Sequence, residues 1–297
     1  MNKKFIYESG GIKMRSKKLK LMVGALLVTM VGATFVGCGS NSSEGENNTA
    51  SNKDSVTISI SGSTSVGPLM EKIQEKYEEE NNNITLEIQQ NGSGAGIKDV
   101  ISGISEIGMS SRELKDEEKT SVQGTTVAYD GIALLVNPEN TVKNISLEDV
   151  KKIYTGEITN WKDLGGDDSP IVVVSREEGS GTRDAFQEIV GYESEELTKD
   201  ATISDGSGAV KTTVAGNKNA IGFASFEYID NTVKALNVND VEPTAENVKA
   251  GDYKISRPFI LVTKEDSLTE NGQKLIDFVL STEGQQIVEE NKLITIE

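Results

Sequence analysis

The residues best suited to chemistry in this sequence lie in one stretch, residues 175–183, which reads Ser-Arg-Glu-Glu-Gly-Ser-Gly-Thr-Arg. It follows an apolar run at 171–174 that is typical of a buried strand, and it precedes a helical pattern of apolar residues at 185–190. A helix start carries free backbone N–H groups and the positive end of the helix dipole. Arg176 adds a guanidinium fork, and the serine and threonine add hydroxyls. Because these groups can all donate hydrogen bonds, the stretch predicts a site for a small oxyanion.

The same stretch also has a simpler interpretation as a capped loop, in which Ser180 or Thr182 is the N-cap of the helix. Repetition of the pattern favours the anion site. Loops of glycine and serine, some with threonine, follow strand-like runs and open helical patterns at residues 61–65, 91–96, 179–182 and 205–208. In an open α/β sheet, ligands bind beyond the carboxyl ends of the strands, where such loops gather. The four loops together therefore predict a pocket lined by donors.

Strands alternate with helical patterns along residues 55–297, which predicts an α/β fold. Hydrophobic strands near 137 and 257 are interpreted as paired crossovers between two lobes. The first lobe is expected to hold residues 55–136 and 257–297, and the second lobe residues 137–256. We expect each lobe to contain a mixed, mostly parallel sheet flanked by helices, with a two-strand hinge. Two lobes joined in this way can close on a ligand between them.

Composition restricts the classes of partner. The 297 residues are 36% hydrophobic and 26% charged, as in a soluble globular protein of one or two domains. The formal net charge is −17, and it becomes −23 without residues 1–37, which hold seven Lys or Arg and one Glu. Such acidity argues against nucleic acid or an anionic membrane surface as a partner. It does not argue against an enclosed anion site, because salt screens surface charge beyond about 8–10 Å.

The first 37 residues have the pattern of a secretory signal, in which five basic residues at 13–20 precede an apolar run at 21–36. That run is shorter than the roughly 20 residues of a membrane-spanning helix, and Met14 could be the true start. Cys38, the only cysteine, ends a Phe-Val-Gly-Cys run that resembles a bacterial lipobox, which implies lipidation of Cys38. A chance cysteine at the end of the signal is the alternative. Residues 38–54 are polar and predict a disordered tether.

The order and spacing of six short segments resemble the phosphate-binding receptors of bacterial ABC importers, which have the periplasmic-binding-protein type II fold. The segments are Gly62–Ser65, Asn91–Gly96, Ile107–Arg112, Asp130–Ala133, Ile158–Trp161 and Arg176–Thr182. The resemblance implies that the anion is held by Thr64, Ser65, Ser93, Arg176, Ser180, Gly181 and Thr182. It also implies a lipid-anchored protein on the outer face of the cytoplasmic membrane. Such a protein passes inorganic phosphate to a membrane-embedded ABC permease with its ATPase.

One position departs from the family pattern. Many relatives place an aspartate after the third strand to accept the proton of hydrogen phosphate, and Ser111 occupies that position here. Because a carboxylate repels sulfate, a serine is expected to reject sulfate less strongly. We hypothesise that Asp130 takes over the acceptor role, although a structural aspartate at a strand edge fits the sequence equally well. Arg112 could reach the anion or pair with a carboxylate, and either Glu177 or Glu178 could hold the guanidinium of the site.

A hydrolase is the main competing class, with Ser180 and Ser93 as candidate nucleophiles. Neither serine lies in a Gly-x-Ser-x-Gly motif, the chain has no histidine, and the absence of a Gly-Lys dipeptide excludes a P-loop. A Ser–Lys pair is left open by the sequence. A receptor for sulfate or molybdate and a lipid-anchored adhesin or signalling protein are the remaining alternatives. We expect a binding protein without catalytic residues, cofactor, metal or nucleic-acid partner.

Overall fold

The computed structural model describes residues 55–296; the predicted signal segment, the tether and Cys38 lie outside them. The strands are β1 (Val56–Gly62), β2 (Ile84–Gln90), β3 (Ile107–Ser110), β4 (Gln123–Val136), β5 (Asn144–Ile145), β6 (Val172–Arg176), β7 (Thr202–Ser204), β8 (Ala220–Ser225), β9 (Lys234–Ala235), β10 (Asn237–Val238) and β11 (Ser256–Thr263). The α-helices are α1 (Gly67–Glu80), α2 (Ser93–Ser102), α3 (Asp116–Lys119), α4 (Leu147–Thr155), α5 (Gly181–Val190), α6 (Ser207–Ala215), α7 (Ala245–Lys249), α8 (Glu270–Leu280) and α9 (Thr282–Glu290). Short 3₁₀ turns are η1 (Trp161–Leu164), η2 (Ser194–Glu196) and η3 (Phe226–Tyr228). No helix within residues 55–296 is long and apolar enough to cross a membrane.

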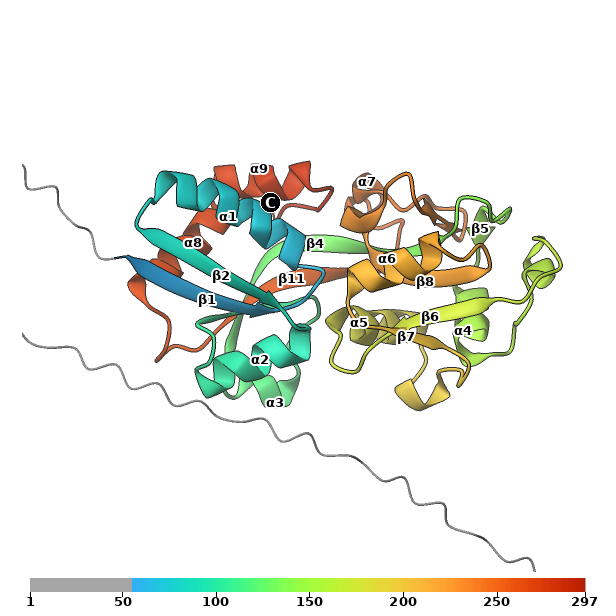
Figure 1. Ribbon diagram of the computed structural model, residues 1–297, viewed down its shortest axis with the longest axis horizontal. Helices are drawn as coiled ribbons and strands as arrows, with labels where there is room; N and C mark the ends of the chain where they lie inside the picture. Colours follow the sequence, from blue (N-terminus) through green and yellow to red (C-terminus); the bar gives the residue numbers. More distant parts are fainter. Residues whose placement is uncertain (1–54, 297) are drawn as a thin grey trace, which may run out of the picture. The chain divides into compact units, whose positions relative to one another are not determined.

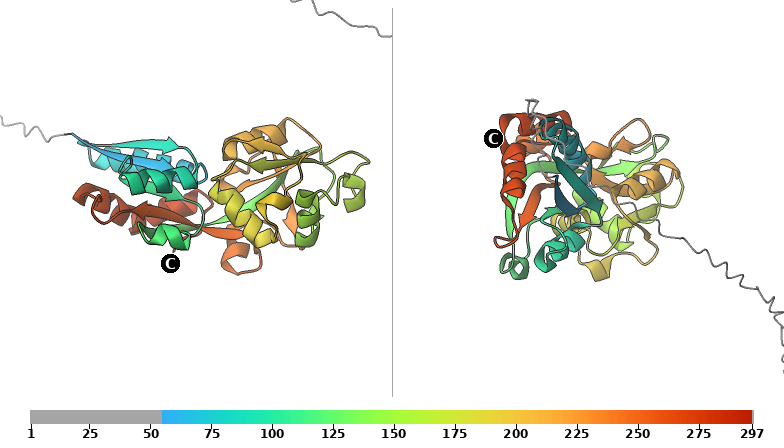
Figure 2. Two further views of the ribbon diagram at one scale, coloured as in Figure 1. Left: turned by 90° about the horizontal axis from the view of Figure 1, so that it is seen from below. Right: turned by 60° about the vertical axis from the view of Figure 1, so that its left-hand side comes forward.

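Two long strands join the halves of a mixed sheet whose order is β2-β1-β3-β11-β4-β8-β6-β7, with β9 beside β4. The outer pairs are parallel: β1 pairs with β2 and β3, and β6 pairs with β7 and β8. In contrast, β4 and β11 run antiparallel to each other and to their neighbours β8 and β3. Figures 1 and 2 show β4 and β11 running between two groups of helices and parallel strands. This arrangement confirms the predicted α/β fold with a two-strand connection.

The two largest hydrophobic clusters meet at the middle of β4 and at the start of β11. Ala128 and Phe259 pack in the core beneath α1, α8 and α9, whereas Ile132 and Ile255 belong to the core of α4, α5 and α6. The division thus falls between residues 128 and 132 on β4, and between 255 and 259 around the start of β11. The lobe boundaries that we predicted at 136/137 and 256/257 stay a prediction.

Local sequence explains how the helices begin after the strands. Pro68 occupies the first turn of α1, where no intrahelical N–H is needed, and the apolar side of this helix is buried. Ser180 is the N-cap of α5, and its hydroxyl accepts the N–H of Arg183 at 3.2 Å. Gly206 precedes α6 with a φ of 86°, a conformation that favours glycine. The capped-loop interpretation is therefore confirmed for Ser180, while the remaining N–H groups of the α5 start are still available to a ligand.

Candidate anion site

The loops after β1 and β6 meet at the junction between the two groups of elements. Ser65 Oγ, next to α1, lies 2.8 Å from Thr182 Oγ1 in the first turn of α5. Arg176, at the end of β6, donates from Nη2 to Thr64 Oγ1 at 3.1 Å. These contacts join residues more than 110 positions apart in the sequence. The structure therefore brings together the predicted hydroxyl donors of the first loop and the predicted guanidinium.

The second loop adjoins the same place from another side. Ser93 Oγ lies 3.2 Å from Ser111 Oγ, and the N–H of Ser111 donates to Ser93 Oγ at 3.1 Å. Gly181 faces this pair so closely that an added Cβ would lie 2.3 Å from Ser93 Oγ and 2.9 Å from Ser111 Oγ. The N–H of Gly94 also donates to the carbonyl of Gly179 at 3.0 Å. A glycine at 181 is thus required for α5 to approach the second loop in this arrangement.

Ser207 is a residue of the cluster that our predicted site did not include. Its hydroxyl accepts from Arg176 Nη1 at 3.0 Å and lies 2.9 Å from Ser65 Oγ. Its backbone N–H, at the start of α6, donates to Thr64 Oγ1 at 3.2 Å. The sequence signal was the fourth glycine-serine loop at 205–208, which we recognised as a loop of this kind without assigning a residue from it.

The cluster is buried and rich in donors. Arg176, Ser180 and Thr182 are each 1% exposed, and Ser93, Ser111 and Ser207 are buried as well. Hydroxyl groups can donate as well as accept, and an arginine guanidinium only donates. An anion enclosed by such groups would recover the hydrogen bonds that it loses with its water shell. The arrangement therefore offers hydrogen-bond donors for binding an anion.

The guanidinium of Arg176 is held in place by its neighbour in the chain. Arg176 donates from Nε and Nη2 to the two carboxylate oxygens of Glu177 at 2.8 and 2.7 Å. Burial raises the pKa of the Glu177 carboxyl, but the hydrogen bonds and charge of Arg176 outweigh this effect and lower it overall. Glu178 is exposed to solvent. The structure thus assigns the orienting role to Glu177 rather than Glu178.

Asp130 has partners other than the anion cluster. Its carboxylate forms a fully buried ion pair with Arg257, with Nη2 of the arginine 2.9 Å from Oδ2. Its other oxygen accepts from Ser225 Oγ at 2.9 Å and from the N–H of Phe226 at 3.4 Å. Arg257 in turn donates from Nη1 to the carbonyl of Ser111 at 3.3 Å, which links the pair to the cluster. The expected role of Asp130 as a proton acceptor for phosphate stays a prediction.

Arg112 pairs with carboxylates on two sides. Its Nη1 and Nη2 donate to the carboxylate oxygens of Glu118 at 2.8 and 2.9 Å. Its Nε lies 3.0 Å from Asp184 Oδ2. Of the two roles that the sequence left open for Arg112, the structure therefore favours pairing with acidic side chains over contact with the anion.

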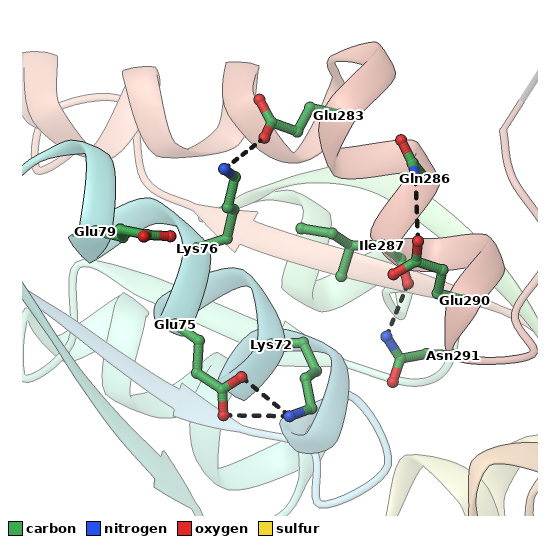
Figure 3. A pocket seen from close by; sticks show the side chains of 9 residues that line it. All are labelled: Lys72, Glu75, Lys76, Glu79, Glu283, Gln286, Ile287, Glu290 and Asn291. Atoms are coloured by element: carbon green, nitrogen blue, oxygen red, sulfur yellow. Dashed lines mark hydrogen bonds and ion pairs between the residues drawn. The ribbon is translucent and has the colours of Figure 1, made fainter.

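A groove of about 390 Å³ between α1 and α9, shown in Figure 3, includes none of the loop residues described above. Its lysines are already paired: Lys72 lies 3.0 Å from Glu75, and Lys76 lies 3.1 Å from Glu283. These side chains are exposed, so water and salt weaken their charges. The groove is therefore a poorer candidate for an anion than the buried cluster.

A buried carboxyl near the Asp130–Arg257 pair predicts an unusual pH dependence of stability. Glu227 Oε1 is buried without a hydrogen-bond partner among residues 55–296, and Oε2 accepts only weakly from Ser225 Oγ, at 3.4 Å. Burial, and then the charge of Asp130, raise the pKa of the Glu227 carboxyl well above its ordinary value, although Arg257 opposes this effect. The folded protein therefore holds a proton on Glu227 up to a higher pH than the unfolded chain does.

Because the pKa of Glu227 is raised in the folded state, this group contributes most to the stability of the protein below its unfolded pKa of about 4.3. Its contribution to stability falls as pH rises above that value. We expect Glu227→Gln to stabilise the protein at pH 7–8 relative to the parent and to flatten the loss of stability between pH 5 and 8. Thermal unfolding as a function of pH measures this effect, with the exposed Glu246→Gln as the control. If the unfolding temperatures of the parent and Glu227→Gln changed with pH in parallel, the raised pKa of Glu227 would be contradicted.

Comparison with known proteins shows which family this sequence resembles. A model of the PBP superfamily domain matches residues 47–283. The phosphate-binding protein PstS of Bacillus subtilis is 35% identical over 285 residues, which cover 93% of this chain and 92% of that protein. The phosphate-binding protein PstS of Borreliella burgdorferi is 31% identical over 250 residues, which cover 80% of this chain and 90% of that protein.

Solved structures of phosphate-binding receptors also resemble this chain. A candidate phosphate ABC transporter substrate-binding protein from Clostridium perfringens, solved with bound phosphate, is 57% identical with a TM-score of 0.80. The match covers 81% of this chain and 100% of that one. An ABC-type phosphate transport receptor from Vibrio cholerae is 36% identical with a TM-score of 0.68, covering 80% of this chain and 99% of that one. The chain therefore belongs to the PBP superfamily and, within it, to the PstS family of phosphate-binding receptors of ABC importers.

Proposed function

We propose that this protein captures inorganic phosphate outside the cytoplasm and delivers it to an ABC permease. The observation that carries the proposal is the hydrogen bonding of Arg176 to Thr64 and Ser207, which gathers one guanidinium and two hydroxyl groups from three separate loops. The PstS relatives are binding proteins by name, which confirms the prediction of a binding protein rather than an enzyme. Two outer sets of parallel strands, connected through β4 and β11 of the same mixed sheet, suit a receptor that opens and closes around its ligand.

The proposed contacts with phosphate come from both sides of the junction. We assign them to the predicted residues Thr64, Ser65, Ser93, Ser111, Arg176, Ser180, Gly181 and Thr182, and to Ser207. Arg176 supplies the positive charge, and its Nη1 and Nη2, which donate to Ser207 and Thr64 in the structure, are the groups that would turn to the oxygens of the anion. The starts of α2, α5 and α6 supply backbone N–H groups and the positive ends of their dipoles. The acceptor role predicted for Asp130 remains part of the proposal, and its partner Arg257 also links it to the site by donating to the carbonyl of Ser111.

Closure explains how the captured anion is retained. In the structure, loops from the two sides contact each other directly, as in the hydrogen bond from Tyr228 Oη to the carbonyl of Thr64 at 2.7 Å. We propose that residues 55–136 with 257–297 form one lobe and residues 137–256 the other, and that phosphate enters while the lobes are apart. Closure then excludes water and strengthens each charge-assisted hydrogen bond. Release to the permease requires the reverse motion.

Attachment to the membrane is the part of the proposal that depends on the N-terminal sequence. We propose that residues 1–37 are removed as a signal, that Cys38 carries lipid, and that residues 38–54 tether the receptor to the outer face of the cytoplasmic membrane. The proposed partners are a membrane-embedded permease and its ATPase. Replacement of Cys38 by serine is the direct test of the anchor, because it would release the receptor from the membrane fraction without changing phosphate binding.

Calorimetric titration of residues 39–297 with phosphate, arsenate, sulfate and molybdate tests the proposed function. We expect micromolar or tighter binding of phosphate, since several charge-assisted hydrogen bonds of about 1.5–3 kcal/mol each are available. Tighter binding of sulfate or molybdate than of phosphate would mean that phosphate is not the ligand. The comparison with sulfate is informative because Ser111, which carries no charge, is expected to reject sulfate less strongly than an aspartate would. Absence of heat and of thermal stabilisation with all four anions would favour the adhesin or signalling alternative.

A further inference from the structure

A second charged contact, between Arg112 and Asp184, adjoins the proposed phosphate site. Arg112 follows β3 and is the neighbour of Ser111, whereas Asp184 lies in the first turn of α5, two residues after Thr182. Arg112 Nε lies 3.0 Å from Asp184 Oδ2. The two residues therefore join the loop of the first group of elements to the helix that begins at the anion site.

Arg112 is fixed independently of Asp184. Its Nη1 and Nη2 bind both oxygens of Glu118, and Nη1 also donates to the carbonyl of Glu113 at 2.7 Å. Glu118 is held in turn by the backbone N–H of Lys115 at 2.8 Å. The guanidinium thus stays oriented whether or not α5 is near, and its Nε is the part directed at Asp184. Little conformational entropy is lost when the ion pair forms.

This contact is less exposed to water than an ordinary surface ion pair. The side chain of Arg112 is 8% exposed and that of Asp184 is 30% exposed. Arg112 Nε is buried and has no hydrogen bond of good geometry among the described residues, so the carboxylate of Asp184 supplies the opposite charge at this atom. Fully exposed pairs contribute little because water screens them, whereas a partly buried pair keeps more of its attraction. Separation of α5 from Arg112 would expose both charges again.

We propose that Arg112 and Asp184 form a latch that holds the receptor closed and sets the rate of phosphate release without touching phosphate. The inference rests on the proposed function, because it assumes that opening moves α5 away from the loop after β3. Asp184 is then a positioning residue that acts by stabilising the closed state. A ligand that binds only when the receptor closes loses affinity in proportion to the loss of the closed population.

The sign of the effect separates the latch from simple electrostatics. Asp184 carries a negative charge close to an anion site, so a purely Coulombic effect predicts tighter phosphate binding when this charge is removed. The latch predicts the opposite. We expect Asp184→Asn to accelerate phosphate release about tenfold and to weaken binding to a similar extent, with little change in the association rate. Asp184→Glu, which keeps the charge, should restore most of the slow release.

The experiment measures phosphate association and release by rapid mixing, and affinity by calorimetry, for the parent and three variants. Glu188→Gln is the matched control, because Glu188 is exposed on the same helix one turn further along and lines the same groove. Added salt should accelerate release from the parent more than from Asp184→Asn, which no longer has the ion pair. Equal or slower release from Asp184→Asn, with phosphate still bound by the parent, would overturn the latch. Failure of the parent to bind phosphate would instead overturn the proposed function.

Discussion

Arg176→Ala is expected to lower the affinity for phosphate by at least about a hundredfold, the largest binding effect in this protein, because two or more charge-assisted hydrogen bonds are lost. The side chain is 1% exposed and donates to Thr64 and Ser207 within the cluster. Its removal also leaves Glu177 without its counter-ion, and this negative charge would repel the ligand. Calorimetric titration with phosphate measures the loss.

Two companion variants show which property of Arg176 matters. Arg176→Lys keeps the charge without the planar fork, so its affinity should lie between those of the parent and Arg176→Ala. The double variant Arg176→Ala with Glu177→Gln removes the unpaired carboxylate and should recover part of the loss. Circular dichroism of each variant controls for folding. If Arg176→Ala bound phosphate within threefold of the parent, the proposed site would be wrong.

Arg257→Met should cause the largest loss of stability, about 3–5 kcal/mol, because it leaves the carboxylate of Asp130 buried without its counter-ion. Asp130 is completely buried, and Arg257 is 3% exposed and packs 5.4 Å over the ring centroid of Phe259. Methionine fills much of the same space without charge, so the loss reports on the ion pair rather than on a cavity. Urea unfolding followed by circular dichroism measures the free energy of unfolding.

The double variant Arg257→Met with Asp130→Asn provides the matched control. It removes both charges, and it should be considerably more stable than Arg257→Met alone, since no unpaired charge is then buried. The same variants show whether the ion pair affects phosphate binding, because Arg257 also donates to the carbonyl of Ser111 in the proposed site. A loss below about 1 kcal/mol for Arg257→Met would mean that Asp130 is neutral in the folded protein, in contrast to the ion pair described above.

Local sequence was sufficient to predict the elements that surround the site. The spacing of Leu69, Ile73 and Tyr77, which are buried on one side of α1, is by itself typical of a helix. The donor loops were evident because glycine, serine and threonine recur where strands end. Arg176 was also identified from its position at the end of β6. Each of these inferences depends on residues within about ten positions of one another, where spacing along the chain limits spacing in three dimensions.

Contacts between distant segments needed the tertiary structure. Asp130 and Arg257 are 127 positions apart, and they face each other because β4 and β11 pair antiparallel in a register that sets one opposite the other. Ser207 meets Thr64 across 143 positions. The choice of Glu177 over Glu178 likewise depended on which side chain points toward Arg176 and which toward solvent.

The amino-acid sequence by itself therefore determined the kind of site in this protein, a set of helix starts and hydroxyls with one guanidinium. Hydrophobic periodicity and loop composition are local properties, and they persist whatever the rest of the chain does. Only the tertiary structure decided the counter-ion of each buried charge, as for Arg112 between Glu118 and Asp184. The physical reason is that pairing register and helix packing, rather than spacing along the chain, select which of 47 acidic residues lies within reach of a given arginine.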